Sequence, residues 1–104
     1  MDIAVIYFDG CPSWRIAENR LQEALNTIGA STPQIRTVEV SSEVKAQAAG
    51  FAGSPTILID GTDLFPVPRP SAALACRLYS TPSGLAGSPT VAQLVLALSE
   101  RTRS

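Results

Sequence analysis

The arrangement of hydrophobic and polar residues predicts strands that alternate with helices. Residues 3–8 are uniformly apolar and end at an Asp-Gly pair, which is typical of a central strand buried on both faces. From Trp14 to Ile28, apolar residues recur every three or four positions with polar residues between them. This spacing predicts an amphipathic helix with Pro12 near its first turn and Gly29 just past its end.

The middle of the chain predicts a second strand and helix, followed by a third strand. Residues 35–40 partly alternate between apolar and polar side chains, as expected of a strand nearer the edge of a sheet. Ser41 or Ser42 can cap a short helix that ends at Gly50. The third strand is predicted over residues 56–60.

The last part of the chain is predicted less completely. Asp60 and the glycine after it form a turn signal that starts a hairpin into residues 62–65. Residues 66–87 are rich in loop-forming residues and yield no assignment. Ser88 and Pro89 predict the cap and first turn of a closing helix with apolar positions at Val91, Leu94, Val95 and Leu98. The predicted order is βαβαββα in one α/β domain.

Composition and charge narrow the classes of function. The chain has 104 residues, 45% of them apolar and 16% charged, which indicates one ordinary globular domain over residues 1–104. Eight basic and nine acidic residues give a net charge of −1, without the basic excess that a nucleic-acid-binding surface needs. We therefore expect no nucleic-acid partner.

We expect a cytoplasmic protein with reduced thiols. The first apolar run follows Asp2 and lacks the basic leader and cleavage site of a signal peptide. No run reaches the ~20 apolar residues of a membrane span, so no membrane association is expected. Seven of the eight basic residues are Arg and Ala is abundant, which is typical of a GC-rich bacterial genome.

The chain contains no His and two Cys. The lack of an imidazole excludes Ser-His-Asp hydrolysis, Cys-His proteolysis and the common zinc sites. Two Cys alone cannot build a structural zinc site, and they are too few for the disulfide framework of a small secreted domain. We expect no cofactor and no resident metal, which leaves the chemistry of two thiols.

Cys11 directly follows the first strand and precedes the first helix. At this place the free amides and the positive end of the helix dipole favour the thiolate, which is the nucleophilic form. The alternative is a buried Cys that packs as a small hydrophobe. Because Gly10 and Pro12 put Cys11 on the turn, we favour the reactive thiol. Asp9 is first a turn residue, since its carboxylate can accept a proton but also disfavours a neighbouring thiolate.

Gly53-Ser54-Pro55-Thr56 stands immediately before the third strand. A proline there suits the start of a strand because it cannot donate to the ladder. Cis peptides account for only ~5–6% of X–Pro bonds, so these residues by themselves favour the trans form.

The order of strand, Cys-Pro at a helix start, helix, strand, helix, Ser-Pro-Thr, hairpin and closing helix resembles the thioredoxin fold over most of the chain, and least over residues 66–87. The resemblance implies a four-stranded mixed sheet with flanking helices and a cis Pro55 beside a reactive Cys11. More narrowly, Tyr-Phe-Asp-Gly-Cys-Pro-x-Trp resembles the start of small bacterial thioredoxin-like proteins of the DF family, some of which carry selenocysteine where Cys11 stands. That resemblance implies chemistry at position 11.

The chain departs from thioredoxins at Trp14, which stands where their second Cys would be, so a local disulfide is excluded. Cys11 acts alone, through a mixed disulfide with an external thiol, or with Cys76 as a distant resolving thiol. Cys76 can also be an unreactive, partly buried thiol, because nothing in the sequence spacing fixes the two cysteines at the ~5.5–6 Å Cα separation that a disulfide needs. Arg77 is placed to stabilise a thiolate at Cys76.

The candidate site therefore has Cys11 and Cys76 as catalytic thiols. The candidate substrate-binding groove consists of Pro12, Trp14, Ser54, Pro55 and Thr56. Trp14 also belongs to the apolar stripe of its helix, where packing is the more ordinary role, and the same holds for Tyr7 and Phe8 in their strand.

The leading hypothesis is a monothiol thioredoxin-like oxidoreductase or peroxidase. Cys11 attacks a disulfide, peroxide or other electrophile, Pro55 shapes the groove, and Cys76, a low-molecular-weight thiol or a partner protein resolves the intermediate. A second hypothesis uses the two thiolates to capture mercuric ion or to cleave an organomercurial compound, since soft thiolates bind soft ions. The third is a non-catalytic thioredoxin-like binding module.

Overall fold

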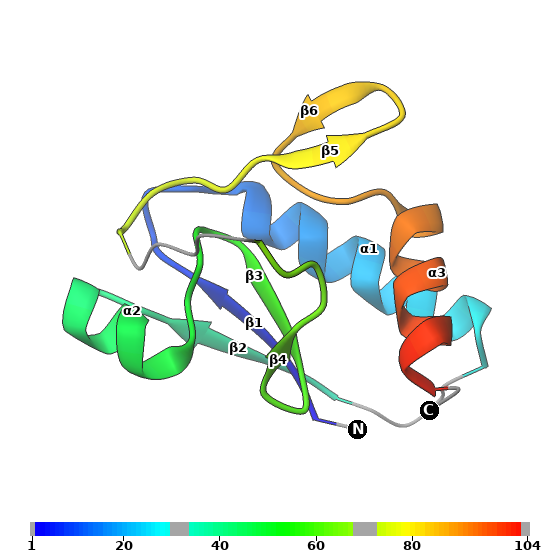
Figure 1. Cartoon of the computed structure of the whole chain (residues 1–104), viewed down its shortest axis with the longest axis horizontal. Helices are drawn as coiled ribbons and strands as arrows, with labels where there is room; N and C mark the ends of the chain where they lie inside the picture. The colour runs from blue at the N-terminus through cyan, green and yellow to red at the C-terminus, as the bar shows by residue number, and fades with distance from the viewer. Residues whose placement is uncertain (1, 30–33, 68–72, 103–104) are drawn as a thin grey trace.

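A computed structural model describes residues 2–29, 34–67 and 73–102 of the chain. In these residues a four-stranded sheet is flanked by three helices, and a two-stranded hairpin stands apart from it (Figure 1). The elements in chain order are β1 (Ile3–Tyr7), α1 (Ser13–Thr27), β2 (Ile35–Glu39), α2 (Glu43–Ala49), β3 (Thr56–Ile59), β4 (Thr62–Asp63), β5 (Tyr79–Thr81), β6 (Gly84–Ala86) and α3 (Val91–Thr102). The predicted α/β class with a four-stranded mixed sheet is confirmed.

The sheet has the strand order β2-β1-β3-β4. β1 runs parallel to β2 and antiparallel to β3, and β4 pairs antiparallel with β3. β1 is central and its first four residues are buried, whereas β2 lies at an edge and has only half-buried and exposed residues. Both placements agree with the sequence pattern, because a strand covered on two faces is uniformly apolar and an edge strand is not.

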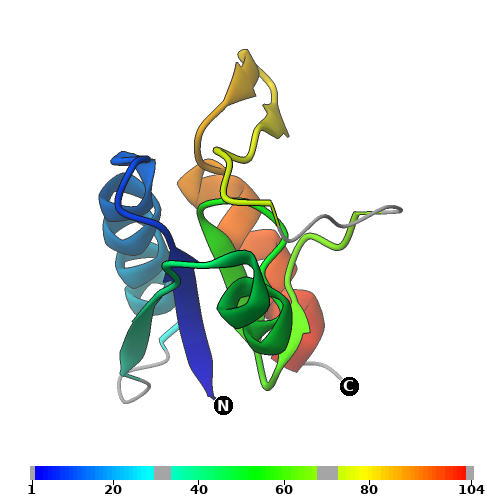
Figure 2. The ribbon, with the colours of Figure 1, turned by 90° about the vertical axis from the view of Figure 1, so that its left-hand side faces the viewer.

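Helices lie on both faces of the sheet, α1 and α3 on one face and α2 on the other (Figure 2). On one face, Val5 and Ile57 pack in a cluster with Leu21 and Leu25 of α1 and with Leu94 of α3. On the other face, the cluster is formed by Ile6, Val40, Ala46 and Phe51, at and around α2. The period-2 alternation of β1 therefore sends its odd and even residues into separate cores.

The ends of the first two helices follow the predicted signals. α1 begins directly after Pro12, and Gly29 follows its end with φ +78°. Of the two serines proposed to cap α2, Ser42 is the cap, because its hydroxyl accepts a hydrogen bond from the backbone N–H of Lys45 (3.2 Å). Gly50 ends α2 in a left-handed conformation.

The predicted cap of the closing helix was wrong. The Thr90 hydroxyl accepts from the Gln93 N–H (3.1 Å), and the Thr90 N–H donates to the Gln93 side-chain oxygen (2.9 Å). This reciprocal pair is a capping box, which satisfies two otherwise unpaired donors. Ser88 is instead buried, and its hydroxyl donates to the Pro89 carbonyl (2.9 Å).

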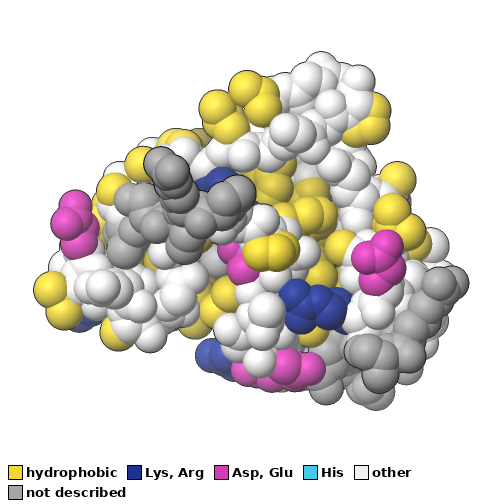
Figure 3. Space-filling model, in the orientation of Figure 1, with side chains coloured by type: hydrophobic (Ala, Val, Ile, Leu, Met, Phe, Trp, Pro, Cys, Tyr) yellow, Lys and Arg dark blue, Asp and Glu magenta, His cyan; other side chains and the backbone are white. Residues whose placement is uncertain are grey.

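The β5–β6 hairpin lies within residues 66–87, for which no element was predicted. Residues 68–72 of that segment lie outside the described residues. Apart from the buried Tyr79, the hairpin strands are exposed or half-buried, so they carry no core-facing periodicity. On the face shown in Figure 3, hydrophobic side chains fill the hollow below the hairpin and charged side chains are scattered.

Candidate functional site

Cys11 lies on the turn between β1 and α1, as the sequence predicts. Its backbone N–H donates to the Phe8 carbonyl (3.3 Å), and Pro12 separates it from the first residue of α1. Only 2% of Cys11 is exposed. The turn position is therefore confirmed, but the residue is buried in this state of the protein.

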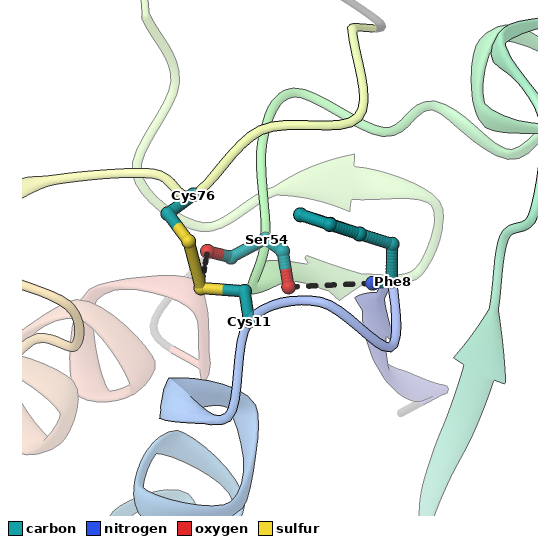
Figure 4. The surroundings of a disulfide bond; sticks show 4 residues. All are labelled: Phe8, Cys11, Ser54 and Cys76. Carbon is teal, nitrogen blue, oxygen red and sulfur yellow. Dashed lines mark hydrogen bonds between the residues drawn. A yellow bond between two sulfur atoms is a disulfide. The ribbon is translucent and has the colours of Figure 1, made fainter.

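Cys11 and Cys76 form a disulfide (Figure 4). Their Cα atoms are 5.8 Å apart, although the residues are separated by 65 positions in the chain. The expectation of reduced thiols is wrong for this structure, because the tertiary fold brings together two cysteines that no sequence pattern connects. Cys76 is exposed, so it does not fit the alternative of a partly buried, unreactive thiol.

The backbone of Ser54 holds the segment that carries Cys76. The Ser54 N–H donates to the Ala75 carbonyl (2.9 Å), and the Arg77 N–H donates to the Ser54 carbonyl (2.8 Å). Cys76 thus stands between two backbone hydrogen bonds, in a short parallel bridge with Ser54. These bonds position its Cα independently of the S–S bond.

Ser54 also contacts the turn that carries Cys11. Its hydroxyl accepts from the Phe8 N–H (3.4 Å), and its carbonyl oxygen lies 3.7 Å from the Cys11 sulfur (Figure 4). In the disulfide this sulfur has no proton, whereas in the reduced protein the thiol can donate to the same carbonyl. One residue therefore bridges the two segments that the disulfide joins.

The Ser54–Pro55 peptide bond is cis, as the resemblance implied. The Pro55 carbonyl accepts from the Tyr79 hydroxyl (2.5 Å), and the Thr56 hydroxyl donates to the Gly53 carbonyl (2.5 Å). Ser54, Pro55 and Thr56 are all buried. They support the site from within, and their role in substrate binding stays a prediction.

Trp14 packs rather than projecting from the helix. Its ring stacks on Tyr7, with centroids 4.0 Å apart and planes 16° from parallel, and it contacts the core between α1, α3 and the sheet. The Arg15 guanidinium carbon lies 5.0 Å from the Trp14 ring centroid. The packing interpretation of Trp14 is confirmed, while Pro12 is the exposed member of the predicted groove.

The structure pairs the Arg77 side chain with Asp63, whereas the sequence predicted that it stabilises a thiolate at Cys76. Arg77 Nη1 donates to the Asp63 carboxylate (2.8 Å), and Nη2 donates to the Phe65 carbonyl. The guanidinium carbon lies 4.6 Å from the Tyr79 ring centroid. Asp63 neutralises this charge, so Arg77 anchors the segment that follows Cys76 to β4.

Tyr79 completes this anchor. Burial raises the pKa of Tyr79 well above its ordinary value, the Arg77 charge opposes the rise, and the Asp63 charge adds to it. The ring also packs edge-on against Phe65, with centroids 5.6 Å apart. A tyrosine held neutral in this way donates its hydroxyl proton to the Pro55 carbonyl and links β5 to the start of β3.

Asp63 and Tyr79 belong to the site, but no sequence signal pointed to them. Asp63 fell in a predicted hairpin, and Tyr79 fell in the unassigned segment. No spacing rule joins an acid to an arginine 14 positions later across a loop. Neither residue could have been found by motif.

The part of the chain that the structure describes contains no group of three or more His, Cys, Asp or Glu side chains placed to hold a metal ion. None of its helices is both long enough and apolar enough to cross a membrane. Comparison of the chain with protein-family models, with curated proteins and with solved structures finds no match.

Proposed function

We propose that this protein is a thiol–disulfide oxidoreductase with a thioredoxin-like fold, and that the Cys11–Cys76 pair is its redox group. The observation that carries the proposal is the disulfide itself, which joins the turn before α1 to an exposed segment 65 residues later. The cytoplasmic location expected from the sequence is consistent with this role, because disulfides in that compartment are usually transient and catalytic or redox-sensing.

The arrangement of the sheet supports the thioredoxin-like part of the proposal. β1 is parallel to β2 and antiparallel to β3, and the turn after β1 meets the residues before β3 at Ser54. This is the relationship between Cys11 and the Ser-Pro-Thr segment that the resemblance implies. In this interpretation the segment that carries Cys76 and the β5–β6 hairpin that follows it are additions to that fold.

Reduction of the pair is a two-electron exchange. A thiolate attacks one sulfur of the disulfide, forms a mixed disulfide and expels the other sulfur as a thiolate. A second external thiolate attacks the external sulfur of the mixed disulfide and releases an external disulfide. Two external thiols are oxidised to one disulfide, the protein disulfide is reduced to two thiols, and the two protons pass to the protein.

Contacts other than the S–S bond favour closure of the pair after reduction. The two backbone hydrogen bonds of Ser54 keep Cys76 beside the turn of Cys11. A thiol held in this way reacts intramolecularly, at a high effective concentration. The pair can therefore cycle without a Cys-x-x-Cys motif.

Thiol–disulfide exchange in the wild type, Cys11→Ser and Cys76→Ser tests the proposal. We expect the folded wild type to gain two thiols on reduction with dithiothreitol and to lose two hydrogens on reoxidation, as followed by mass spectrometry. It should also accelerate electron transfer from dithiothreitol to hydroxyethyl disulfide. Each single variant should lose this turnover, because the intramolecular disulfide cannot form.

Other outcomes discriminate among the alternatives. A bond that resists excess dithiothreitol in the folded protein contradicts the proposal, as does turnover no faster than in the variants. Binding of one mercuric ion by both thiols, without disulfide turnover, supports the soft-metal hypothesis. Consumption of peroxide in preference to the disulfide makes the protein a peroxidase.

A further inference from the structure

The two cysteines of the disulfide differ in their exposure to solvent. Cys11 is 2% exposed, whereas Cys76 belongs to an exposed segment. Figure 4 shows the Cys11 sulfur bonded to that of Cys76 and directed at the Ser54 carbonyl, 3.7 Å away. An external reagent therefore meets Cys76 first.

The geometry of exchange makes this difference decisive. The incoming thiolate approaches along the S–S axis, opposite the sulfur that leaves, and access governs which sulfur is attacked. Attack on Cys76 comes from the side of Cys76 that faces away from Cys11. Attack on Cys11 has to come from the side of Cys11 itself, which is buried.

The backbone beside Cys11 is also occupied. Both the N–H and the carbonyl of Ser54 are bonded to the segment around Cys76, through Ala75 and Arg77. A second extended polypeptide cannot pair with Ser54 unless it displaces that segment. A small thiol needs to reach only the exposed Cys76, so it is the partner that this surface fits.

We propose that Cys76, rather than Cys11, exchanges with the external partner, and that this partner is a low-molecular-weight thiol. The inference rests on the proposed function and reverses the order of roles expected from the sequence. In reduction, the external thiolate bonds to Cys76, the Cys11–Cys76 bond breaks, and Cys11 leaves with the electron pair as a thiolate. A second external thiolate then attacks the external sulfur, which releases the external disulfide and the Cys76 thiolate.

Oxidation by a low-molecular-weight disulfide follows the same steps in reverse. The Cys76 thiolate attacks the external disulfide and expels one external thiolate. The Cys11 thiolate then attacks the Cys76 sulfur of the mixed disulfide, closes the internal bond and expels the second external thiolate. Cys11 thus acts only within the protein.

Trapping the mixed disulfide of the wild type tests the assignment. The oxidised protein is treated with limiting 2-mercaptoethanol, quenched in acid, alkylated with N-ethylmaleimide and digested with trypsin. Cys11 falls in tryptic residues 1–15 and Cys76 in residues 46–77, because the arginine between them at position 69 precedes a proline. We expect the mercaptoethanol adduct on residues 46–77 and the maleimide on residues 1–15. The reverse pattern, or an even distribution, overturns the assignment.

Single variants provide a second measurement that does not need the intermediate to accumulate. Folded Cys11→Ser retains the exposed thiol and should form a stable adduct with hydroxyethyl disulfide. Folded Cys76→Ser retains the buried thiol, which should react at least about tenfold more slowly and reach the rate of the other variant in urea. Equal rates in the two folded variants overturn the inference, and circular dichroism establishes that each is folded.

The failure of this inference is distinct from failure of the proposed function. If the wild type turns over but the adduct forms on Cys11, the proposed oxidoreductase function stands. Only the assignment of Cys76 as the exchanging cysteine is then wrong. If no thiol reduces the wild-type disulfide, both this inference and the proposed function are wrong.

Discussion

Arg77 and Asp63 form an ion pair with Nη1 and Oδ2 2.8 Å apart, in which the two side chains are only 5% and 16% exposed. The pair fixes the residue directly after Cys76 to β4, the last strand of the central sheet. The exposed cysteine is therefore carried by a segment whose next residue is anchored in the interior. The geometry of the redox pair depends on this anchor as well as on the S–S bond.

Asp63→Asn is expected to lower the free energy of unfolding by about 3 kcal/mol, because it leaves a buried guanidinium without its counter-charge. The same change should slow reclosure of the Cys11–Cys76 disulfide, since Arg77 no longer holds its segment. Urea denaturation measures the first effect, and mass spectrometry of quenched reoxidation samples measures the second.

Asp2→Asn is the matched control for this change. It removes the acid of another Arg–Asp pair, in which the side chains of Arg36 and Asp2 are 58% and 56% exposed. Solvent screens such a pair, so the urea midpoint should stay nearly unchanged. A loss of stability as large as that of Asp63→Asn would show that burial is not the cause.

Gly53→Ala should displace the Cys76 segment. Gly53 has φ +99°, and a Cβ there would lie 2.8 Å from the Arg77 Cβ. We expect the free energy of unfolding to fall by about 2–4 kcal/mol, because the backbone conformation is strained and the new methyl group overpacks against Arg77. Disulfide closure should also become slower.

Gly29→Ala separates the two causes. Gly29 also has a positive φ, +78°, but among the described residues other than its chain neighbours no atom lies within 4 Å of its Cβ position. Gly29→Ala should lower the free energy of unfolding by about 1 kcal/mol and should not change the rate of disulfide closure. If the two variants lose the same stability and close at the same rate, the contact between Gly53 and Arg77 has no role.

Reduction of the disulfide should lower the stability of the folded protein. A cross-link between residues 65 apart removes roughly 4 kcal/mol of chain entropy from the unfolded state. Urea denaturation of the wild type with and without dithiothreitol measures the difference. The Cys11→Ser/Cys76→Ser double variant should resemble the reduced protein and should not respond to dithiothreitol.

Burial of Tyr79 predicts a loss of stability in alkaline solution. Its pKa is raised in the folded protein by burial, so the unfolded state releases the phenolic proton at a lower pH. The stabilisation is fully present below the ordinary tyrosine pKa of about 10 and is lost as the pH rises above it. Ultraviolet titration should show Tyr79 ionising only with unfolding.

Tyr79→Phe should flatten this alkaline decline. At neutral pH the variant should be about 1–2 kcal/mol less stable, because the Pro55 carbonyl loses its donor. An alkaline decline as steep as that of the wild type would assign it to another group.

The central part of the fold was predictable because its signals are local. The uniform apolar run of β1, the helical spacing of α1 and the serine cap of α2 each lie within one element. Whether one face or both faces of a strand or helix are buried determines the pattern of apolar residues along its sequence. The cap of α3 was misplaced although Thr90 stands three residues before Gln93, the spacing of a capping box, whereas Ser88 stands three residues before Val91.

By itself the sequence determined the order of the first strands and helices, the position of Cys11 on a turn and, through its resemblance, a cis Pro55. Only the tertiary structure decided that Cys76 reaches Cys11 and that Asp63 neutralises Arg77. These contacts join residues 65 and 14 positions apart across a segment without a periodic pattern. Such contacts depend on how the chain returns over the sheet, and that path leaves no regular spacing in the residues that form it.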